Sequence, residues 1–169
     1  MAAAGVRELV EAHYQPLYRY AYRLSGSAAD AEDLTQEAFG KAVERLGQLR
    51  DPDKARHWLF RIVRNAYLHT VRDAKRARVV PLDSVGDVPA RLDESRPAMD
   101  IEPDQLQAAL NELDESFRTP LILFYFDEFS YKDIADHMDL PIGTVMSRLA
   151  RAKAHLRAKL ARHADPAGA

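Results

Sequence analysis

Residues 130–160 read SYKDIADHMDLPIGTVMSRLARAKAHLRAKL, and this stretch decides the fold of the C-terminal part of the chain. Ser130 is placed to cap a short helix, and Asp133 stands three residues later as the acid of a capping box. The Asp-Leu-Pro sequence at 139–141 ends that helix. Pro141 suits the first turn of the next helix, where its missing N–H is not needed. A short helix, a tight turn and a longer helix predict a helix-turn-helix, whose second helix enters the DNA major groove.

Both helices of this motif are amphipathic. Helical spacing predicts that their buried residues are Ile134, Ala135, Met138, Val145, Leu149, Ala152 and Leu156. The other faces of the second helix carry the basic residues Arg148, Arg151, Lys153, Arg157 and Lys159. No acid occurs between residues 143 and 162. A basic, solvated helix that ends a bundle is the alternative, but the complete helix-turn-helix pattern favours DNA binding.

The net charge of −2 over 169 residues conceals a segregation of charge along the chain. Residues 55–78 hold seven lysines and arginines and one acid, whereas residues 79–104 hold seven acids and two arginines. Nucleic-acid binding depends on local basic patches rather than on the total charge. The near-neutral sum therefore does not exclude a DNA-binding protein.

The chain contains no cysteine, which excludes disulfides, thiolate metal sites and cysteine nucleophiles and fits a reducing compartment. Its N-terminal stretch has no apolar core long enough for a signal peptide. No uncharged apolar run reaches the length that a membrane span requires. We expect a soluble, cytoplasmic protein without membrane insertion.

The N-terminal part is predicted to contain three helices. The first covers residues 6–24, and Pro16 should kink it or start a new segment. The second covers residues 28–46 and turns inward Leu34, Ala38, Phe39, Val43 and Leu46. The third covers residues 54–78, with an apolar stripe of Trp58, Leu59, Ile62, Val63, Ala66, Tyr67 and Val71.

Two faces of these helices are candidate binding surfaces. On the second helix Asp30, Asp33 and Glu37 share a face, with Gln36 beside them. No histidine or cysteine accompanies these acids, which argues against a metal site. Acids near the start of a helix commonly complement the helix dipole. Spacing alone therefore favours a solvated face, with protein docking as the functional alternative. The third helix interleaves arginines with aromatic residues, as a single-strand binder requires, although a core position is favoured for its tryptophan.

Residues 79–103 contain four prolines, many acids and no helical period, and they predict a flexible acidic linker. The fold prediction is therefore all-α, with small helical domains at 5–78 and 104–162. Residues 104–113 form an amphipathic helix. The apolar run at 117–126 fits a buried strand or a short buried helix, and the helical context favours the helix.

Taken together, the chain resembles the sigma-70 family of bacterial transcription initiation factors, in its extracytoplasmic-function (ECF) group. DAEDLTQEAFGKAV at 30–43 resembles the group's core-polymerase-binding segment, and WLFRIVRNAYLHTVRDAKR at 58–76 resembles its −10 element segment. Residues 130–156 resemble its −35 element segment. Three segments in this order across an acidic linker are a specific match over nearly the whole chain.

The resemblance implies roles for individual residues. It assigns docking on core RNA polymerase to Asp33, Gln36 and Glu37. It assigns binding of the −10 element to Trp58, Arg61, Arg64, Asn65, His69 and Arg72. Asn65 matches the asparagine that captures an extruded base, and the alternative is that it caps or interrupts the helix. His69 stands where the group more often has Asp or Asn.

For the −35 element the resemblance implies contacts from Thr144, Ser147, Arg148, Arg151 and Lys153. Met146 departs from the pattern, because the group often has Arg or Lys there. Thr144 also matches a turn-closing position.

The implied function is that of an alternative sigma factor, which binds core RNA polymerase and promoter DNA and helps to melt the −10 region. Such a protein is not an enzyme and needs no cofactor or metal. Group members are commonly held inactive by an anti-sigma factor, but the sequence identifies none. A stand-alone helix-turn-helix regulator is the alternative, although it leaves the arginine-and-tryptophan helix unexplained. A hydrolase built on the acids near Asp33 lacks any nucleophile–base pair.

Overall fold

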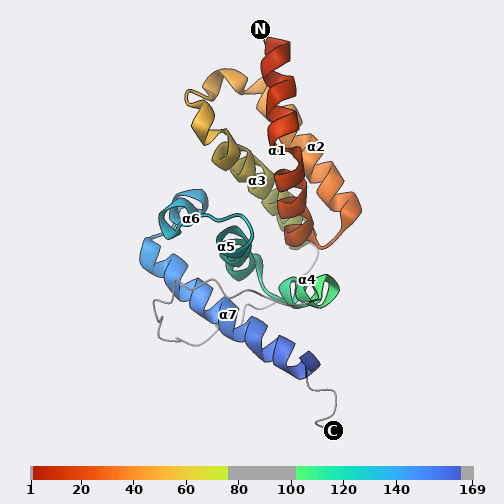
Figure 1. The fold of residues 1–169 in the computed structure, drawn as a ribbon, viewed down its shortest axis with the longest axis vertical. Helices are drawn as coiled ribbons and strands as arrows, with labels where there is room; N and C mark the ends of the chain where they lie inside the picture. The colour runs from red at the N-terminus through yellow and green to blue at the C-terminus, as the bar shows by residue number, and fades with distance from the viewer. Residues whose placement is uncertain (1, 76–101, 165–169) are drawn as a thin grey trace. The chain divides into compact units, whose positions relative to one another are not determined.

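The computed structural model describes residues 2–75 and 102–164, and every regular element in these ranges is helical (Figure 1). The chain divides into two compact units, Met1–Ser84 and Val85–Ala169. The predicted all-α, two-part architecture is confirmed. The predicted linker at 79–103 lies outside the described residues except at its end, where Glu102 and Pro103 begin the first helix of the second unit.

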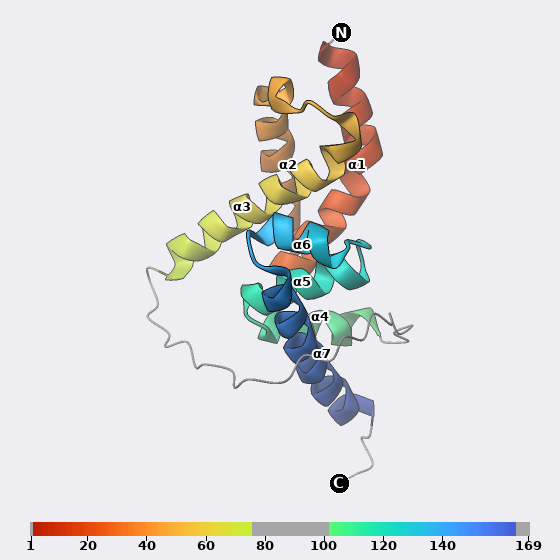
Figure 2. The same ribbon diagram turned by 90° about the vertical axis from the view of Figure 1, so that its left-hand side faces the viewer.

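Helices α1 (Ala2–Ser25), α2 (Ala28–Glu44) and α3 (Ala55–Lys75) build the first unit. Two short 3₁₀ helices, Leu46–Gln48 and Pro52–Lys54, connect α2 to α3. Helices α1 and α2 lie side by side and α3 runs obliquely across both (Figure 2). All three helices contribute to one core, whose fully buried large side chains are Leu17, Tyr20, Leu24, Leu59, Phe60 and Val63.

An aromatic pair joins α1 to α3. The rings of Tyr20 and Phe60 stack with their centroids 4.7 Å apart, and the Arg56 guanidinium lies 5.4 Å from the Phe60 centroid. Phe60 is absent from the predicted apolar stripe. Because Leu59 and Phe60 are neighbours and both fully buried, the buried face of α3 is wider than one stripe.

Helix α1 does not break at Pro16, so the predicted start of a new segment is wrong. Proline inside a helix forfeits one backbone hydrogen bond and crowds the preceding turn, at a cost of about 3 kcal/mol. The turns after Pro16 bury Leu17, Tyr20 and Leu24 completely. This tertiary packing offsets the local cost, which is why the helix continues.

Helix α2 ends at Glu44, earlier than predicted. Val43 is 50% exposed, so its predicted inward position is wrong, and Leu46 is only half-buried. The buried face of α2 follows smaller residues at helical spacing: Ala31, Leu34, Thr35, Ala38, Phe39 and Ala42. Val43 follows Ala42 directly and is therefore turned about 100° away from that face.

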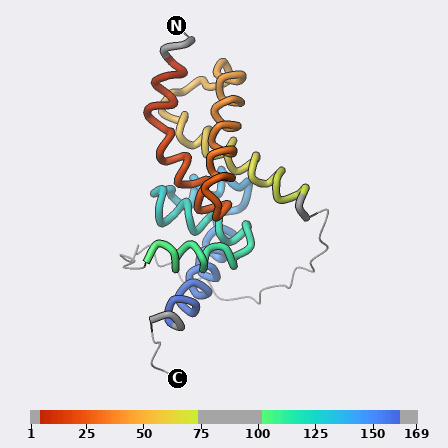
Figure 3. Tube along the Cα trace, turned by 90° about the vertical axis from the view of Figure 1, so that its right-hand side faces the viewer, coloured from red at the N-terminus to blue at the C-terminus, as the bar shows by residue number. Residues whose placement is uncertain are grey.

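Helices α4 (Pro103–Glu112), α5 (Glu115–Tyr125), α6 (Tyr131–Met138) and α7 (Ile142–Ala164) build the second unit. The apolar run at 117–126 lies in α5 except for Phe126, which caps its C-terminal end, so the helical prediction is confirmed. Helix α7 packs against α4, α5 and α6, and Figure 3 shows it passing α4 towards its C-terminal end.

The helix-turn-helix is formed by α6 and α7, as predicted. Both bonds of the capping box are present: the Asp133 amide donates to the Ser130 hydroxyl at 3.1 Å, and the Ser130 amide to the Asp133 carboxylate at 3.3 Å. Asp139 ends α6 in the left-handed region with φ 52°. Pro141 precedes α7 rather than lying in its first turn, and its carbonyl accepts from the Thr144 and Val145 amides.

Candidate nucleic-acid and partner-binding surfaces

The predicted docking residues Asp33, Gln36 and Glu37 are all exposed on α2, on the side opposite its buried face. Glu37 pairs with Lys41 at 2.9 Å, and the Gln36 amide donates to Glu32 at 3.4 Å. The structure thus brings the three side chains together on one exposed surface, which we call the acidic face.

The buried side of α2 holds the acidic face in a fixed position. Ser27 caps the helix by accepting from the Asp30 amide at 3.3 Å. Thr35 is fully buried, and its hydroxyl donates to the Ala31 carbonyl at 2.7 Å. Carboxylates on such a packed helix are oriented before any partner arrives, which suits bidentate pairing with arginines.

On α3, five of the six predicted −10 residues share one face. The spacing of Trp58, Arg61, Asn65, His69 and Arg72 is three or four residues at each step, which aligns them along the helix. We call this set the α3 row. Arg64 lies beside the row and is half-buried, whereas the row's four polar members are exposed.

The N-terminal end of the α3 row is aromatic. Trp58 is half-buried. The prediction that it belongs to the core therefore holds for only part of its side chain. A ring with one covered and one accessible part can pack on the fold and still offer a face to an unstacked base. Asn65 is exposed in the interior of α3, so it neither caps nor ends the helix.

Four of the five predicted −35 residues form one cluster on α7. Ser147 and Arg148 each stand three or four residues from both Thr144 and Arg151, so the four side chains adjoin along the helix. All four are half-buried. One guanidinium nitrogen of Arg148 also donates to the Ser116 carbonyl on α5 at 3.4 Å. Helix α7 is thereby tied to the start of α5.

Lys153, the fifth residue, belongs to a different side of α7. It stands two residues after Arg151, which turns it away from the cluster. Its ammonium group lies 5.4 Å from the centroid of the Tyr125 ring on α5. This cation–π geometry fixes a flexible side chain against the fold. Sequence spacing does not indicate the Tyr125 contact, because the two residues are far apart along the chain.

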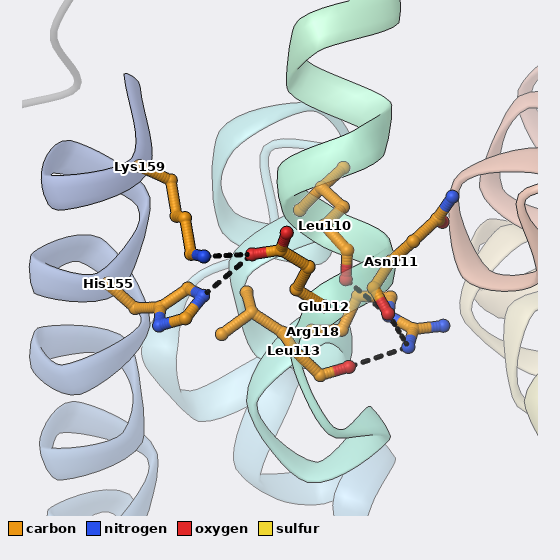
Figure 4. Close-up of polar contacts among 7 residues, drawn as sticks. All are labelled: Leu110, Asn111, Glu112, Leu113, Arg118, His155 and Lys159. Atoms are coloured by element: carbon orange, nitrogen blue, oxygen red, sulfur yellow. Dashed lines mark hydrogen bonds and ion pairs between the residues drawn. The ribbon is translucent and has the colours of Figure 1, made fainter. Parts of the chain in front are cut away.

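Glu112 at the end of α4 forms ion pairs with the C-terminal half of α7 (Figure 4). Its carboxylate lies 2.9 Å from the Lys159 ammonium and 3.7 Å from Nε2 of His155. The hydrogen bond from Lys159 is the main cause that lowers the pKa of Glu112. Lys159 therefore already has an anionic partner within the chain.

Arg118 of α5 closes the end of α4 (Figure 4). It is 9% exposed and donates through Nε to the Leu110 carbonyl at 2.9 Å. Its Nη2 donates to the carbonyls of Leu113 at 2.6 Å and Asn111 at 3.5 Å. The last carbonyls of a helix lack partners within the helix, and a cation there also complements the helix dipole. No sequence pattern indicated this role.

Within residues 2–75 and 102–164, no group of three or more histidine, cysteine, aspartate or glutamate side chains is arranged to hold a metal ion. None of the helices described is both long and apolar enough to cross a membrane.

Comparison with known proteins matches both units to one family. The Sigma-70 region 2 model matches residues 9–77, and the Sigma-70 region 4 model matches residues 104–156. The chain is 40% identical to the ECF RNA polymerase sigma factor SigE of Mycolicibacterium smegmatis over 94% of its own length and 62% of that protein. It is 34% identical to the ECF RNA polymerase sigma factor EcfG of Rhodopseudomonas palustris, over 92% of this chain and 85% of that one.

A solved structure shows the same likeness. The sigma factor RpoE from Bartonella quintana, in complex with the anti-sigma factor NepR, is 28% identical with a TM-score of 0.74 and covers 92% of this chain and 96% of its own. The two family models together match more than half of the chain, in the order that the three motifs predict. The chain therefore belongs to the sigma-70 family of RNA polymerase sigma factors, in its ECF group.

Proposed function

We propose that this protein is an alternative sigma factor, which binds core RNA polymerase and directs it to particular promoters. The observation that carries the proposal is the match of both units, in order, to sigma-70 regions 2 and 4. A stand-alone regulator would use the helix-turn-helix alone. It would give no role to the acidic face or to the exposed polar members of the α3 row.

Each domain has a separate task in this proposal. We assign core docking and −10 binding to residues 5–78 and −35 binding to residues 104–162, with residues 79–103 as their linker. The acidic face docks on core polymerase, since three adjoining polar side chains on a packed helix present a preformed surface. The protein contributes binding rather than catalysis, and its place is the cytoplasm, where polymerase and promoters are.

At the −10 element, the α3 row would hold the non-template strand once it is single-stranded. Arg61 and Arg72 supply positive charge for phosphates, and the accessible part of Trp58 supplies a flat apolar surface. Asn65 stands between them, with an amide that can both donate to and accept from a base edge. Capture of an unstacked base offsets the few kcal/mol that its extrusion costs.

At the −35 element, α7 would enter the major groove with the cluster of Ser147, Arg148 and Arg151 towards the bases and phosphates. Because α7 contains no acid, nothing on the helix itself repels the phosphates. An anti-sigma factor is a further candidate partner, since the similar RpoE was solved in complex with one.

Run-off transcription with purified core polymerase tests the proposal. Genomic fragments are transcribed with core polymerase alone and with the protein added, and start sites are mapped. Sigma activity predicts new starts that require the protein and share −10 and −35 elements. Specific binding of promoter-length DNA without polymerase, together with no new starts, would favour the stand-alone regulator.

Reversing the charge of the acidic face is expected to weaken core binding. In the double variant Asp33→Lys, Glu37→Lys, repulsion replaces attraction to a basic partner surface. The fold should survive, because exposed charges of this kind contribute at most about 1 kcal/mol to stability. Co-purification with core polymerase measures the effect, and thermal melting verifies the fold. Unchanged co-purification in a folded variant would contradict the docking assignment.

Truncating Arg151 is expected to relax promoter preference at one −35 position. A bidentate contact from arginine to guanine accounts for about 1–3 kcal/mol of discrimination. Lys159→Ala is the matched control, because Glu112 already neutralises that lysine in the free chain. It should change binding little and equally for all sequences. Promoter libraries scored with each variant separate the two, and equal, sequence-independent losses would mean that α7 contacts only the DNA backbone.

A further inference from the structure

Helix α2 carries an exposed aliphatic side chain beside the acidic face. Among the side chains that the structure describes, the exposed large hydrophobic ones are Val43, at 50% of its surface, and Ile142, at 42%. Val43 stands seven residues after Gln36, which is close to two full turns, so the two side chains lie on the same side of α2. An apolar group is therefore exposed where the acidic face ends.

Between Val43 and the acidic face stands a glycine that the fold does not require. Gly40 is exposed in the interior of α2, three residues after Glu37 and three before Val43. Among the described residues the glycine with positive φ is Gly26, at 72°, so Gly40 does not serve a left-handed backbone. A Cβ atom at Gly40 would meet nothing within 4 Å. Close packing within the unit therefore gives no reason for a glycine here either.

A glycine in this position weakens the helix. Glycine is a poor helix former, because it loses the most conformational freedom and leaves the helix backbone uncovered. It is well suited to places where another group must approach the backbone closely. Gly40 adjoins Gln36, Glu37 and Val43 along the helix, so the uncovered backbone lies between the charged and the apolar end of one surface. A partner that docks on the acidic face reaches all three parts.

We infer that Gly40 and Val43 extend the acidic face, so that core RNA polymerase packs closely on the α2 backbone at Gly40 and covers Val43. This inference rests on the proposed function, which assigns the adjoining acidic face to core polymerase. It adds that the polymerase surface is basic opposite Asp33 and Glu37 but apolar opposite Val43. Burial of Val43 supplies attraction that salt does not screen, whereas salt screens the attraction of exposed carboxylates.

Two small substitutions test the inference, with the affinity of the full chain for core polymerase as the measurement. Gly40→Ala should raise the melting temperature of the first unit by about 4–8 °C, because alanine is the better helix former. It should nevertheless weaken core binding about fivefold or more, because the added methyl enters a packed surface. Val43→Thr keeps the shape of the side chain but loses one methyl to a hydroxyl, and should weaken core binding about fourfold.

Salt separates the two ends of the surface. The loss in Val43→Thr should be the same at low and at high salt, because no charge changes. The loss in the double variant Asp33→Lys, Glu37→Lys should shrink as salt rises. Gly5→Ala is the matched control for Gly40→Ala, since Gly5 is a helical glycine of α1 at which a Cβ atom would also meet nothing within 4 Å. It should leave core binding unchanged.

The possible failures are distinguishable, and thermal melting verifies that each variant folds. A parent chain that does not bind core polymerase overturns the proposed function and the inference with it. Unchanged binding in the charge-reversed double variant overturns the docking assignment on which the inference rests. If the parent binds and the double variant binds more weakly, unchanged binding of Gly40→Ala or of Val43→Thr overturns the inference alone. A lower melting temperature of Gly40→Ala does so too, because the glycine then serves the fold.

Discussion

Replacing Arg118 with methionine is expected to destabilise the second unit by about 3 kcal/mol. Methionine keeps much of the side-chain volume but removes the donors that reach the carbonyls of Leu110, Asn111 and Leu113. A buried acceptor left without a partner costs about 1–3 kcal/mol, and water at the rim can satisfy only part of this set. The α4–α5 turn should therefore open before the rest of the unit.

The two units allow a sharp measurement. The only tryptophan of the chain, Trp58, lies in the first unit, so its fluorescence reports unfolding there, whereas far-UV circular dichroism reports both units. Arg118→Met should lower the melting temperature of a helical transition that the tryptophan does not sense, and it should speed amide exchange in α4. Glu112→Gln, which weakens only an exposed ion pair, is the control and should change melting slightly. An unchanged melting curve for Arg118→Met would show that other groups satisfy these carbonyls.

Local signals in the sequence were sufficient for most of the fold. The capping box at Ser130 and the apolar spacing of α7 depend on neighbours a few residues away, and both were predicted correctly. The new segment at Pro16, one of two predicted alternatives, and the inward position of Val43 were wrong for one reason: packing between helices decides whether a proline is tolerated and which side of α2 is buried. Spacing within one helix does not contain that information.

The same distinction holds for the candidate surfaces. Residues on one helix, such as the α3 row, can be aligned from spacing alone, and the family resemblance then suggested their partners. Contacts between helices were not predictable, because each joins positions that are separate in the sequence. The examples are Arg118 at the end of α4, Lys153 over Tyr125, and Glu112 with Lys159. Exposure of Ile142 likewise became visible only in the folded unit.

The Asn65→Ala variant is expected to be slightly more stable than the parent and yet defective in promoter opening. Asn65 is exposed in the interior of α3, where alanine has the higher helix propensity by about 0.5 kcal/mol. Loss of the amide removes the contact to an extruded −10 base, and open-complex formation should fall about tenfold or more. Core binding and −35 duplex binding should remain intact, because the acidic face and α7 are unchanged.

Thr70→Ala is the matched control, because it also exchanges an exposed polar side chain of α3 for alanine, and Thr70 lies outside the α3 row. Permanganate footprinting of unpaired thymines on a mapped promoter measures the opening of each variant directly. A template already melted across the −10 region should restore only part of the Asn65→Ala defect, since the base contact itself is still missing. Opening as fast and as complete as that of the parent would show that Asn65 captures no base. A loss of stability would instead reveal a structural role, because a purely functional asparagine on an exposed helix face leaves the fold no weaker when it is replaced by alanine.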